Sequence, residues 1–261
     1  MFDIWEAGHA VLESAKQQLG DEIALIIYTG SRFKGTHSPY SDLDLYYVPR
    51  THAEAHCTLL FDQTPLDLFP VNWSRLESWA NYEQPNTSAI VDATVLYAHS
   101  AADRARLEEL KARIQELQQP EQRPLMVEKA IRLFKQTGYH YFLLDVECTA
   151  ADPFACKREA WKIVEIVLHA LAVMNQTFYH SDCGKNLAEV LALPKRPPDI
   201  ERLLAVIVES ADYVAVKAAV RTLLHQTKAF LADEHQALTA LTPLAEQFRA
   251  YQMFVFTLSA R

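Results

Sequence analysis

Residues 28–47 read YTGSRFKGTHSPYSDLDLYY, a polar segment with an apolar run on each side. The segment Glu22 to Thr29 carries the apolar run IALIIYT, which Gly30 stops, and such a run is typical of a buried strand. After a polar loop, DLDLYYVP at residues 42–49 alternates carboxylate and leucine before a closing proline, so we expect a second strand there. The unusual loop therefore lies between two strands.

Further strands are expected on both sides of a helix. The runs TLLFD and PLDLFPV, residues 58–62 and 65–71, are separated only by Gln63 and Thr64 and predict adjacent strands of the same sheet. The run TVLYAH, residues 94–99, predicts one more strand. Residues 1–118 are thus predicted to form a mixed sheet with helices around it.

Helices in this half are predicted from capping signals and from apolar spacing. One is expected over Phe2 to Leu19, because its apolar residues have helical spacing and Gly20 follows. Another is expected near Ser74, which has capping-box spacing to Glu77. A third is expected to begin at Ser100, with Asp103 in its first turn. Its predicted buried face consists of Leu107, Leu110, Ile114 and Leu117.

The second half has a different character. Residues 118–124, QQPEQRP, are polar and carry two prolines, which indicates a domain boundary. Strand-like alternation nearly disappears beyond this point, and amphipathic stretches predict an all-α helical bundle. We expect these helical stretches at residues 125–147, 156–175, 185–193, 199–210, 212–232 and 234–258.

The overall composition excludes several classes of function. The 261 residues carry a formal net charge of -8, which does not provide the basic surface that long nucleic acid requires. No apolar stretch is long enough for a membrane span, and the first residues do not resemble a signal peptide, so we expect a cytoplasmic protein. The four cysteines form no CxxC pair, and we expect free thiols rather than disulfides or structural zinc.

Two carboxylates in the second strand predict a metal site. Alternate residues of a strand point to the same face, so Asp42 and Asp44 lie side by side while Leu43 and Leu45 face the core. Close carboxylates repel each other unless a cation lies between them, and Mg²⁺ prefers such oxygen ligands. A DxD pair alone is more often a turn or a helix cap, so the prediction depends on the strand context.

The turn after the first strand adds features that favour phosphate binding. A glycine at a strand-to-helix turn allows backbone amides to approach a phosphate, and Ser31 and the helix N-terminus add donors. Arg32 either neutralises a triphosphate or forms a surface ion pair, and Lys34 is a second candidate cation. Asp67 in PLDLF is the candidate third metal ligand. Two alternatives stay open: Asp62 is the ligand instead, or Asp67 is a structural acid that accepts hydrogen bonds from backbone amides.

These residues resemble a known superfamily. Gly30-Ser31, ten intervening residues, Asp42-Leu43-Asp44 and the later Asp67 resemble the signature of the DNA-polymerase-β-like nucleotidyltransferases. Residues 170–204, ALAVMNQTFYHSDCGKNLAEVLALPKRPPDIERLL, are similar to the C-terminal domain of kanamycin nucleotidyltransferase and related aminoglycoside nucleotidyltransferases. The resemblance implies a catalytic domain at residues 1–118 and a helical substrate-binding or partner-binding domain at residues 119–261.

The resemblance also implies an activity. The expected reaction transfers a nucleoside monophosphate, preferably AMP, from ATP or another NTP to a hydroxyl of a small acceptor. Such an acceptor is an aminoglycoside, and its modification would confer antibiotic resistance. Two alternatives stay open: a macromolecular acceptor, as in toxin-antitoxin or protein-modifying members, and a catalytically silent nucleotide-binding regulator. The implied site comprises Asp42, Asp44 and Asp67 as catalytic ligands of two Mg²⁺ ions, and Gly30, Ser31 and Arg32 as nucleotide-binding residues.

Two further expectations concern the helical half. In the kanamycin enzymes a glutamate of this domain acts as the base, but here Lys135 stands where an acid is expected, which leaves Glu128 and Glu147 as candidates. The resemblance also implies a homodimer. The apolar segment YQMFVFTL at residues 251–258 is either an interface strip or part of its own helical domain.

Overall fold

The computed structural model describes residues 20–32, 34–35, 37, 41–50, 57–61, 64–147, 152–181 and 184–239, and also the isolated positions 8, 12 and 13. The helix predicted over Phe2 to Leu19 therefore lies almost wholly outside the described residues, and so does the segment 251–258. The chain divides into two compact units, Met1–Glu116 and Leu117–Arg261, and each is described by itself.

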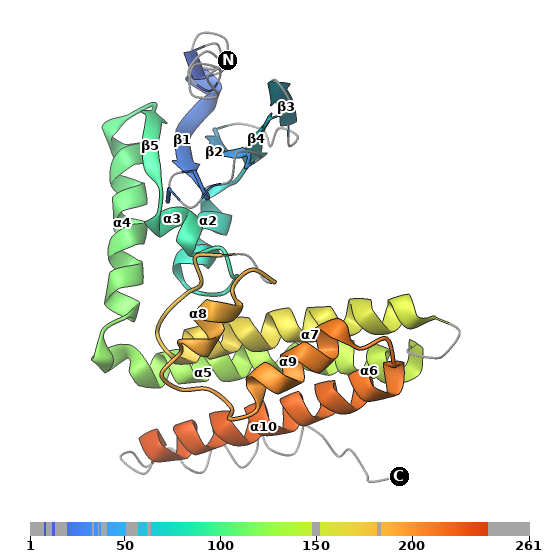
Figure 1. The fold of residues 1–261 in the computed structure, drawn as a ribbon. Coiled ribbons are helices and arrows are strands. Elements are labelled where there is room, and N and C mark those ends of the chain that lie inside the picture. The colour runs from blue at the N-terminus through green and yellow to red at the C-terminus, as the bar shows by residue number, and fades with distance from the viewer. Residues whose placement is uncertain are drawn as a thin grey trace. The chain divides into compact units, whose positions relative to one another are not determined.

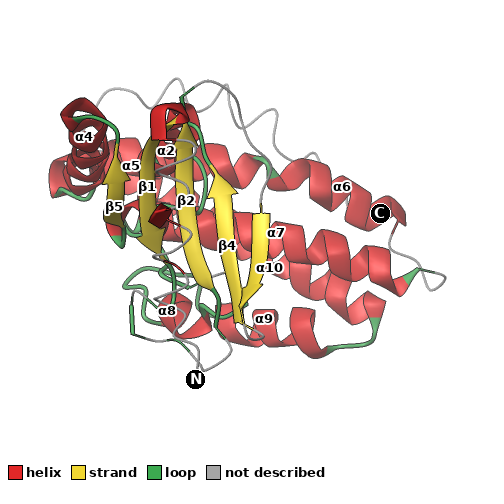
Figure 2. Cartoon of the chain, turned by 90° about the horizontal axis from the view of Figure 1, so that it is seen from above, coloured by secondary structure: helices red, strands yellow, loops and turns green. Residues whose placement is uncertain are grey.

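The first unit contains a five-stranded mixed sheet with the order β3-β4-β2-β1-β5 (Figures 1 and 2). β1 is antiparallel to β2 and β5, β2 is parallel to β4, and β3 and β4 form an antiparallel pair. All the strands predicted from the sequence are confirmed. Their bounds are β1 Ile23–Thr29, β2 Leu43–Pro49, β3 Cys57–Phe61, β4 Thr64–Pro70 and β5 Thr94–Ala98.

The burial of β1 and β2 explains their different sequence patterns. Every residue of β1 is buried, because the strand lies inside the sheet and both of its faces are covered, and it reads as a continuous apolar run. β2 alternates: Leu43 and Leu45 are buried in a core cluster with Leu66, whereas Asp44 on the opposite face is half-buried. This alternation directs the carboxylates of β2 away from the core.

Helices α2 (Trp73–Ala80), α3 (Ser88–Val91) and α4 (Ala101–Leu117) complete the first unit, after the short η1 (Gly20–Glu22). The Ser74 capping box is wrong, because Asn72 caps α2 and its side-chain oxygen accepts a hydrogen bond from the Arg75 amide at 2.8 Å. The predicted start of α4 is confirmed: the Asp103 amide donates to Ser100 Oγ at 3.1 Å. α4 runs alongside β5 (Figure 1), and all four residues of its predicted buried face are buried.

The second unit is helical, which confirms an α+β first half followed by an all-α second half. Its central helix is α7, which packs against α5, α6, α9 and α10. α7 begins after Asp152, whose side chain caps the Ala155 amide at 2.9 Å, with Pro153 at its first position. The helices are η2 Pro120–Gln122, α5 Arg123–Lys135, α6 Thr137–Glu147, α7 Pro153–Met174, α8 Leu187–Leu191, α9 Ile200–Glu209 and α10 Tyr213–Thr239.

Three details of the second unit differ from the prediction. The stretch 125–147 is two helices, α5 and α6, and the hydroxyl of buried Thr137 donates to the Phe134 carbonyl at their junction. α10 continues through residue 233, where the sequence predicted a break. Cys156, buried in α7, is disulfide-bonded, so the expectation of free thiols is wrong for this residue. Among the described residues, no helix is both long and apolar enough to cross a membrane.

A buried carboxylate links α6 to α7. Glu159 is 1% exposed, and it accepts hydrogen bonds from His140 Nδ1 at 2.8 Å and from Arg158 Nε at 2.7 Å. Lys162 Nζ lies 3.6 Å from the same carboxylate. Burial alone raises the pKa of Glu159, but the hydrogen bonds and the two cations outweigh burial and hold the pKa below its usual range.

We expect Glu159→Gln to lower the free energy of unfolding by about 2 kcal/mol at pH 7, because charge-assisted hydrogen bonds to a buried group are lost. A carboxyl whose folded pKa is depressed stabilises the fold above its unfolded pKa and loses that contribution as the pH falls through the folded value. The difference between wild type and variant should therefore shrink below about pH 4. Urea denaturation at several pH values measures it.

Glu165→Gln is the matched control, because Glu165 lies on the same helix but is exposed, and it accepts a hydrogen bond from Trp161 Nε1 at 3.1 Å. We expect this control to change stability by less than about 0.5 kcal/mol. Equal losses in the two variants, or a Glu159→Gln loss that does not depend on pH, would contradict the role of the buried carboxylate.

Candidate metal and nucleotide site

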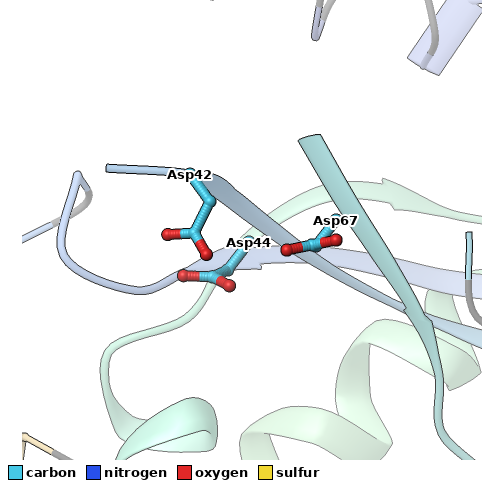
Figure 3. Close-up of side chains that lie close together, drawn as sticks. All are labelled: Asp42, Asp44 and Asp67. Atoms are coloured by element: carbon cyan, nitrogen blue, oxygen red, sulfur yellow. The ribbon is translucent and has the colours of Figure 1, made fainter. Parts of the chain in front are cut away.

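Three carboxylates meet on one face of the sheet. Asp42, Asp44 and Asp67 each offer one oxygen atom, and these atoms lie within 4.8 Å of one another. All three side chains are half-buried, and in Figure 3 the Asp67 carboxylate points toward Asp44. The structure thus brings together the three acids that the sequence singled out as metal ligands.

The strand register explains this convergence. β2 and β4 are parallel neighbours, and Asp44 pairs directly with Asp67. Asp42 comes two residues before Asp44 and so lies on the same side of the strand. The neighbouring Leu43 pairs with Leu66, and both are buried on the opposite face. The register between β2 and β4 therefore brings Asp44 and Asp67 together, and Asp42 joins them from the position just before β2.

Gly30 makes room for one of the three carboxylates. A Cβ atom at Gly30 would lie 2.1 Å from Asp44 Oδ2 and 2.9 Å from Asp44 Cγ, far inside van der Waals contact. Gly30 also has φ +89°, which L side chains rarely adopt. From the sequence, Gly30 was predicted to let backbone amides approach a phosphate. Its close approach to the Asp44 carboxylate was not predicted.

The residues after Gly30 form a turn rather than the start of a helix, so the predicted helix N-terminus is wrong for the described part of this loop. The Lys34 amide donates to the Gly30 carbonyl at 3.2 Å, and the Gly35 amide donates to the Arg32 carbonyl at 3.3 Å. Gly35 also has a positive φ, +69°, which explains why the chain turns here instead of continuing as a helix. Ser31 is half-buried within this turn.

The two cations of the loop have specific partners. Arg32 Nε donates to the backbone carbonyls of Ser41 at 2.8 Å and Asp42 at 3.1 Å, which neither of its predicted roles anticipated. Lys34 Nζ lies 3.2 Å from Asp92 Oδ2, just after α3. The charge of Lys34 is therefore already balanced by a carboxylate with a side-chain exposure of 13%.

Tyr28 lies behind this site on β1. Burial raises the pKa of its phenol to about 12, while the Arg32 guanidinium lowers it and Asp44 raises it by smaller amounts. Tyr28 therefore stays a neutral phenol at physiological pH and does not add a charge to the cluster.

An aromatic surface continues the face that carries the acids. Tyr46 pairs with Phe69 two residues beyond Asp44 and Asp67, and their stacked ring centroids are 5.2 Å apart. Trp79 of α2 packs edge-on against Tyr46, with the centroids 5.4 Å apart. Since residues two apart on a strand share a face, half-buried rings adjoin the carboxylates.

The donor set fits a divalent cation. Three carboxylate oxygens within 4.8 Å of one another are hard ligands for Mg²⁺, which commonly takes its protein ligands from carboxylates and the remainder from water and phosphate. A divalent ion bound at this place would offset the mutual repulsion of the three carboxylates.

The two glutamates predicted as candidates for the base both lie on helices of the second unit. Glu128 is exposed on α5, and Glu147 ends α6 with its side chain outside the described part of the chain. Burial, and secondarily the charge of Arg132, lowers the pKa of Lys135. Three basic side chains of α7, Lys157, Arg158 and Lys162, contact the C-terminal carbonyls of α9 or the Glu159 carboxylate.

Comparison with known proteins places the chain in a family. Residues 104–237, just over half of the chain, match the family model of the KNTase C-terminal domain. The chain therefore belongs to this family, and the sequence resemblance to kanamycin nucleotidyltransferases of the polymerase-β-like superfamily is confirmed. Membership supports a role in nucleotidyl transfer.

Two other comparisons complete these findings. Among solved structures, a nucleotidyltransferase-like protein from Exiguobacterium sibiricum 255-15 matches with a TM-score of 0.43 and 9% sequence identity. That match covers 94% of this chain and 80% of the other. A search of curated proteins finds no significant match.

Proposed function

We propose that the chain is a metal-dependent nucleotidyltransferase that moves a nucleoside monophosphate, AMP by preference, from an NTP to a hydroxyl of a small acceptor. The observation that carries this proposal is the cluster of Asp42, Asp44 and Asp67, whose oxygens lie within 4.8 Å of one another beside the Gly30-Ser31 turn. Family membership supports the reaction class, and the acidic cluster supports the choice of this location for the reaction.

The proposed reaction is an in-line displacement at the α-phosphorus. The acceptor oxygen forms a bond to this phosphorus, the bond to the bridging oxygen breaks, and pyrophosphate leaves with that oxygen. In the same step the acceptor hydroxyl gives up its proton to a water molecule, so that atoms and charge balance. Two Mg²⁺ ions, when bound, would lower the pKa of that hydroxyl and neutralise charge on the departing pyrophosphate.

The side chains of this unit would divide the remaining tasks. Asp42, Asp44 and Asp67 hold the metals, and Asp44 keeps its place because Gly30 has no side chain. Ser31 offers a hydroxyl to the triphosphate from the turn. The half-buried rings of Tyr46 and Phe69 provide an apolar surface on which a sugar ring or base can rest.

We propose an aminoglycoside-type antibiotic as the acceptor class, because ammonium groups are attracted to an acidic protein, and the formal net charge here is -8. Incubation with Mg²⁺, ATP and panels of aminoglycosides, lincosamides and cellular proteins, read by mass spectrometry, tests it. We expect a nucleotidyl adduct on a small molecule. An adduct only on protein would contradict the acceptor class, and no adduct in any panel would contradict the transferase.

Ser31→Ala is expected to raise the KM for the triphosphate about three- to tenfold and to leave the maximal rate within a few-fold of wild type, since one neutral phosphate donor is lost. Steady-state kinetics with varied ATP measure the effect. Thr29→Ser serves as the control, because it changes a neighbouring buried hydroxyl residue without removing the hydroxyl. An unchanged nucleotide affinity for Ser31→Ala by calorimetry would show that the Gly-Ser turn is purely structural.

A further inference from the structure

The backbone at Asp42 lies outside the sheet. β2 begins at Leu43, and the described pairing with β4 starts at Leu43 and Leu66, whereas pairing with β1 reaches Asp44. Asp44 is therefore held in place by two neighbouring strands. Asp42 comes before the first paired residue, and so strand pairing does not fix its position.

Arg32 supplies a restraint at this point. Its Nε–H group lies between two successive carbonyl oxygens, 2.8 Å from Ser41 O and 3.1 Å from Asp42 O. The two acceptors are the last two residues before β2, so one planar guanidinium connects the turn after β1 to the start of β2. The side chain is half-buried, which limits the movement of this connection.

We propose that Arg32 is a positioning residue that fixes the Asp42 carboxylate for metal binding, and that its main task is not to neutralise the triphosphate. This inference rests on the proposed function, because it assumes that Asp42, Asp44 and Asp67 bind a divalent cation. It differs from the role predicted from the sequence, in which Arg32 binds the nucleotide itself.

The sign of the effect on metal affinity separates the two roles. A guanidinium near the carboxylates repels a divalent cation. If Arg32 served only to neutralise the nucleotide, removing its charge would therefore strengthen metal binding in the absence of nucleotide. Removing a residue that orients a ligand weakens metal binding, typically by ten- to a hundredfold. Coulomb repulsion and positioning thus predict opposite changes.

Arg32→Met removes the charge and both hydrogen bonds while keeping an unbranched side chain. We expect its affinity for Mn²⁺, measured by electron paramagnetic resonance without nucleotide, to be about ten- to a hundredfold weaker than that of wild type. Arg50→Met is the matched control: Arg50 is exposed and bonds to the Asp21 carbonyl and to His99, and we expect unchanged affinity. Unchanged or tighter Mn²⁺ binding by Arg32→Met would overturn the proposal.

Two more variants keep the outcomes distinct. If Arg32→Met does not fold by circular dichroism, Arg32→Lys replaces it, and we expect several-fold weaker Mn²⁺ binding because the rigid planar donor is lost although the charge remains. Wild-type affinity in that variant overturns the proposal. Asp42→Asn tests the underlying site: if it leaves Mn²⁺ affinity unchanged, the metal site itself is wrong, whereas weaker binding by Asp42→Asn with normal binding by the Arg32 variants overturns only the positioning role.

Discussion

Asp44→Asn is expected to lower the rate of nucleotidyl transfer by about 10³-fold or more while leaving the fold intact. Asp44 is the middle member of the cluster, because it pairs with Asp67 in the parallel register and follows Asp42 by two residues. Asparagine keeps the shape of the side chain but removes its charge. The lower transfer rate would therefore result from weaker metal binding and weaker stabilisation of the transition state, and not from altered packing.

The stability of the same variant gives a second, independent readout. Three carboxylates this close destabilise the metal-free protein by mutual repulsion, so neutralising one of them should leave the melting temperature equal or slightly higher without Mg²⁺. Added Mg²⁺ should raise the melting temperature of wild type but not of Asp44→Asn. Asp199→Asn, at an exposed carboxylate paired with Arg202, should behave as wild type. A wild-type transfer rate in Asp44→Asn contradicts the assignment.

Gly30→Ala is expected to impair the same site for a steric reason. The new Cβ would lie 2.1 Å from Asp44 Oδ2, so the carboxylate or the turn must move by more than an ångström. The alanine must also adopt φ +89°, which costs about 1–2 kcal/mol. We expect loss of Mn²⁺ binding and a fall in transfer of at least a hundredfold.

Gly35→Ala separates the two parts of this prediction. Gly35 lies in the same loop with φ +69°, but a Cβ there meets nothing within 4 Å. Both variants should lose about 1–2 kcal/mol of unfolding free energy in urea titrations, since both strain the backbone. Only Gly30→Ala should lose Mn²⁺ binding. Equal Mn²⁺ affinities in the two variants would show that the contact with Asp44 is unimportant.

Much of the fold could be predicted from the sequence because its signals are local. The continuous apolar run of β1, the alternation in β2 and the Ser100–Asp103 cap each follow from periodicity or hydrogen bonding within a few residues. The proximity of Asp67 to Asp44 could also be predicted, since an acid between leucines in a strand is energetically costly to bury without a partner. These signals sufficed for the three acids of the site.

The missed features are contacts between distant residues. Arg32 reaches carbonyls nine and ten residues away, and Lys34 pairs with Asp92, and no local pattern marks either contact. The close approach of Gly30 to Asp44 depends on the register of β1 against β2, which depends on packing of the whole sheet. Asn72 rather than Ser74 caps α2. Local sequence does not distinguish them, because both residue types are good N-caps and only tertiary packing decides between them.

Anomalous scattering from crystals grown with Mn²⁺ and a non-hydrolysable ATP analogue tests most directly the claim that the three carboxylates bind a divalent metal. We expect an anomalous peak bounded by carboxylate oxygens of Asp42, Asp44 and Asp67, with the analogue's phosphates as further ligands. Asp44→Asn crystals should lose that peak. The absence of density between these three residues at a Mn²⁺ concentration that saturates binding in solution, or a peak elsewhere on the chain, would contradict the claim.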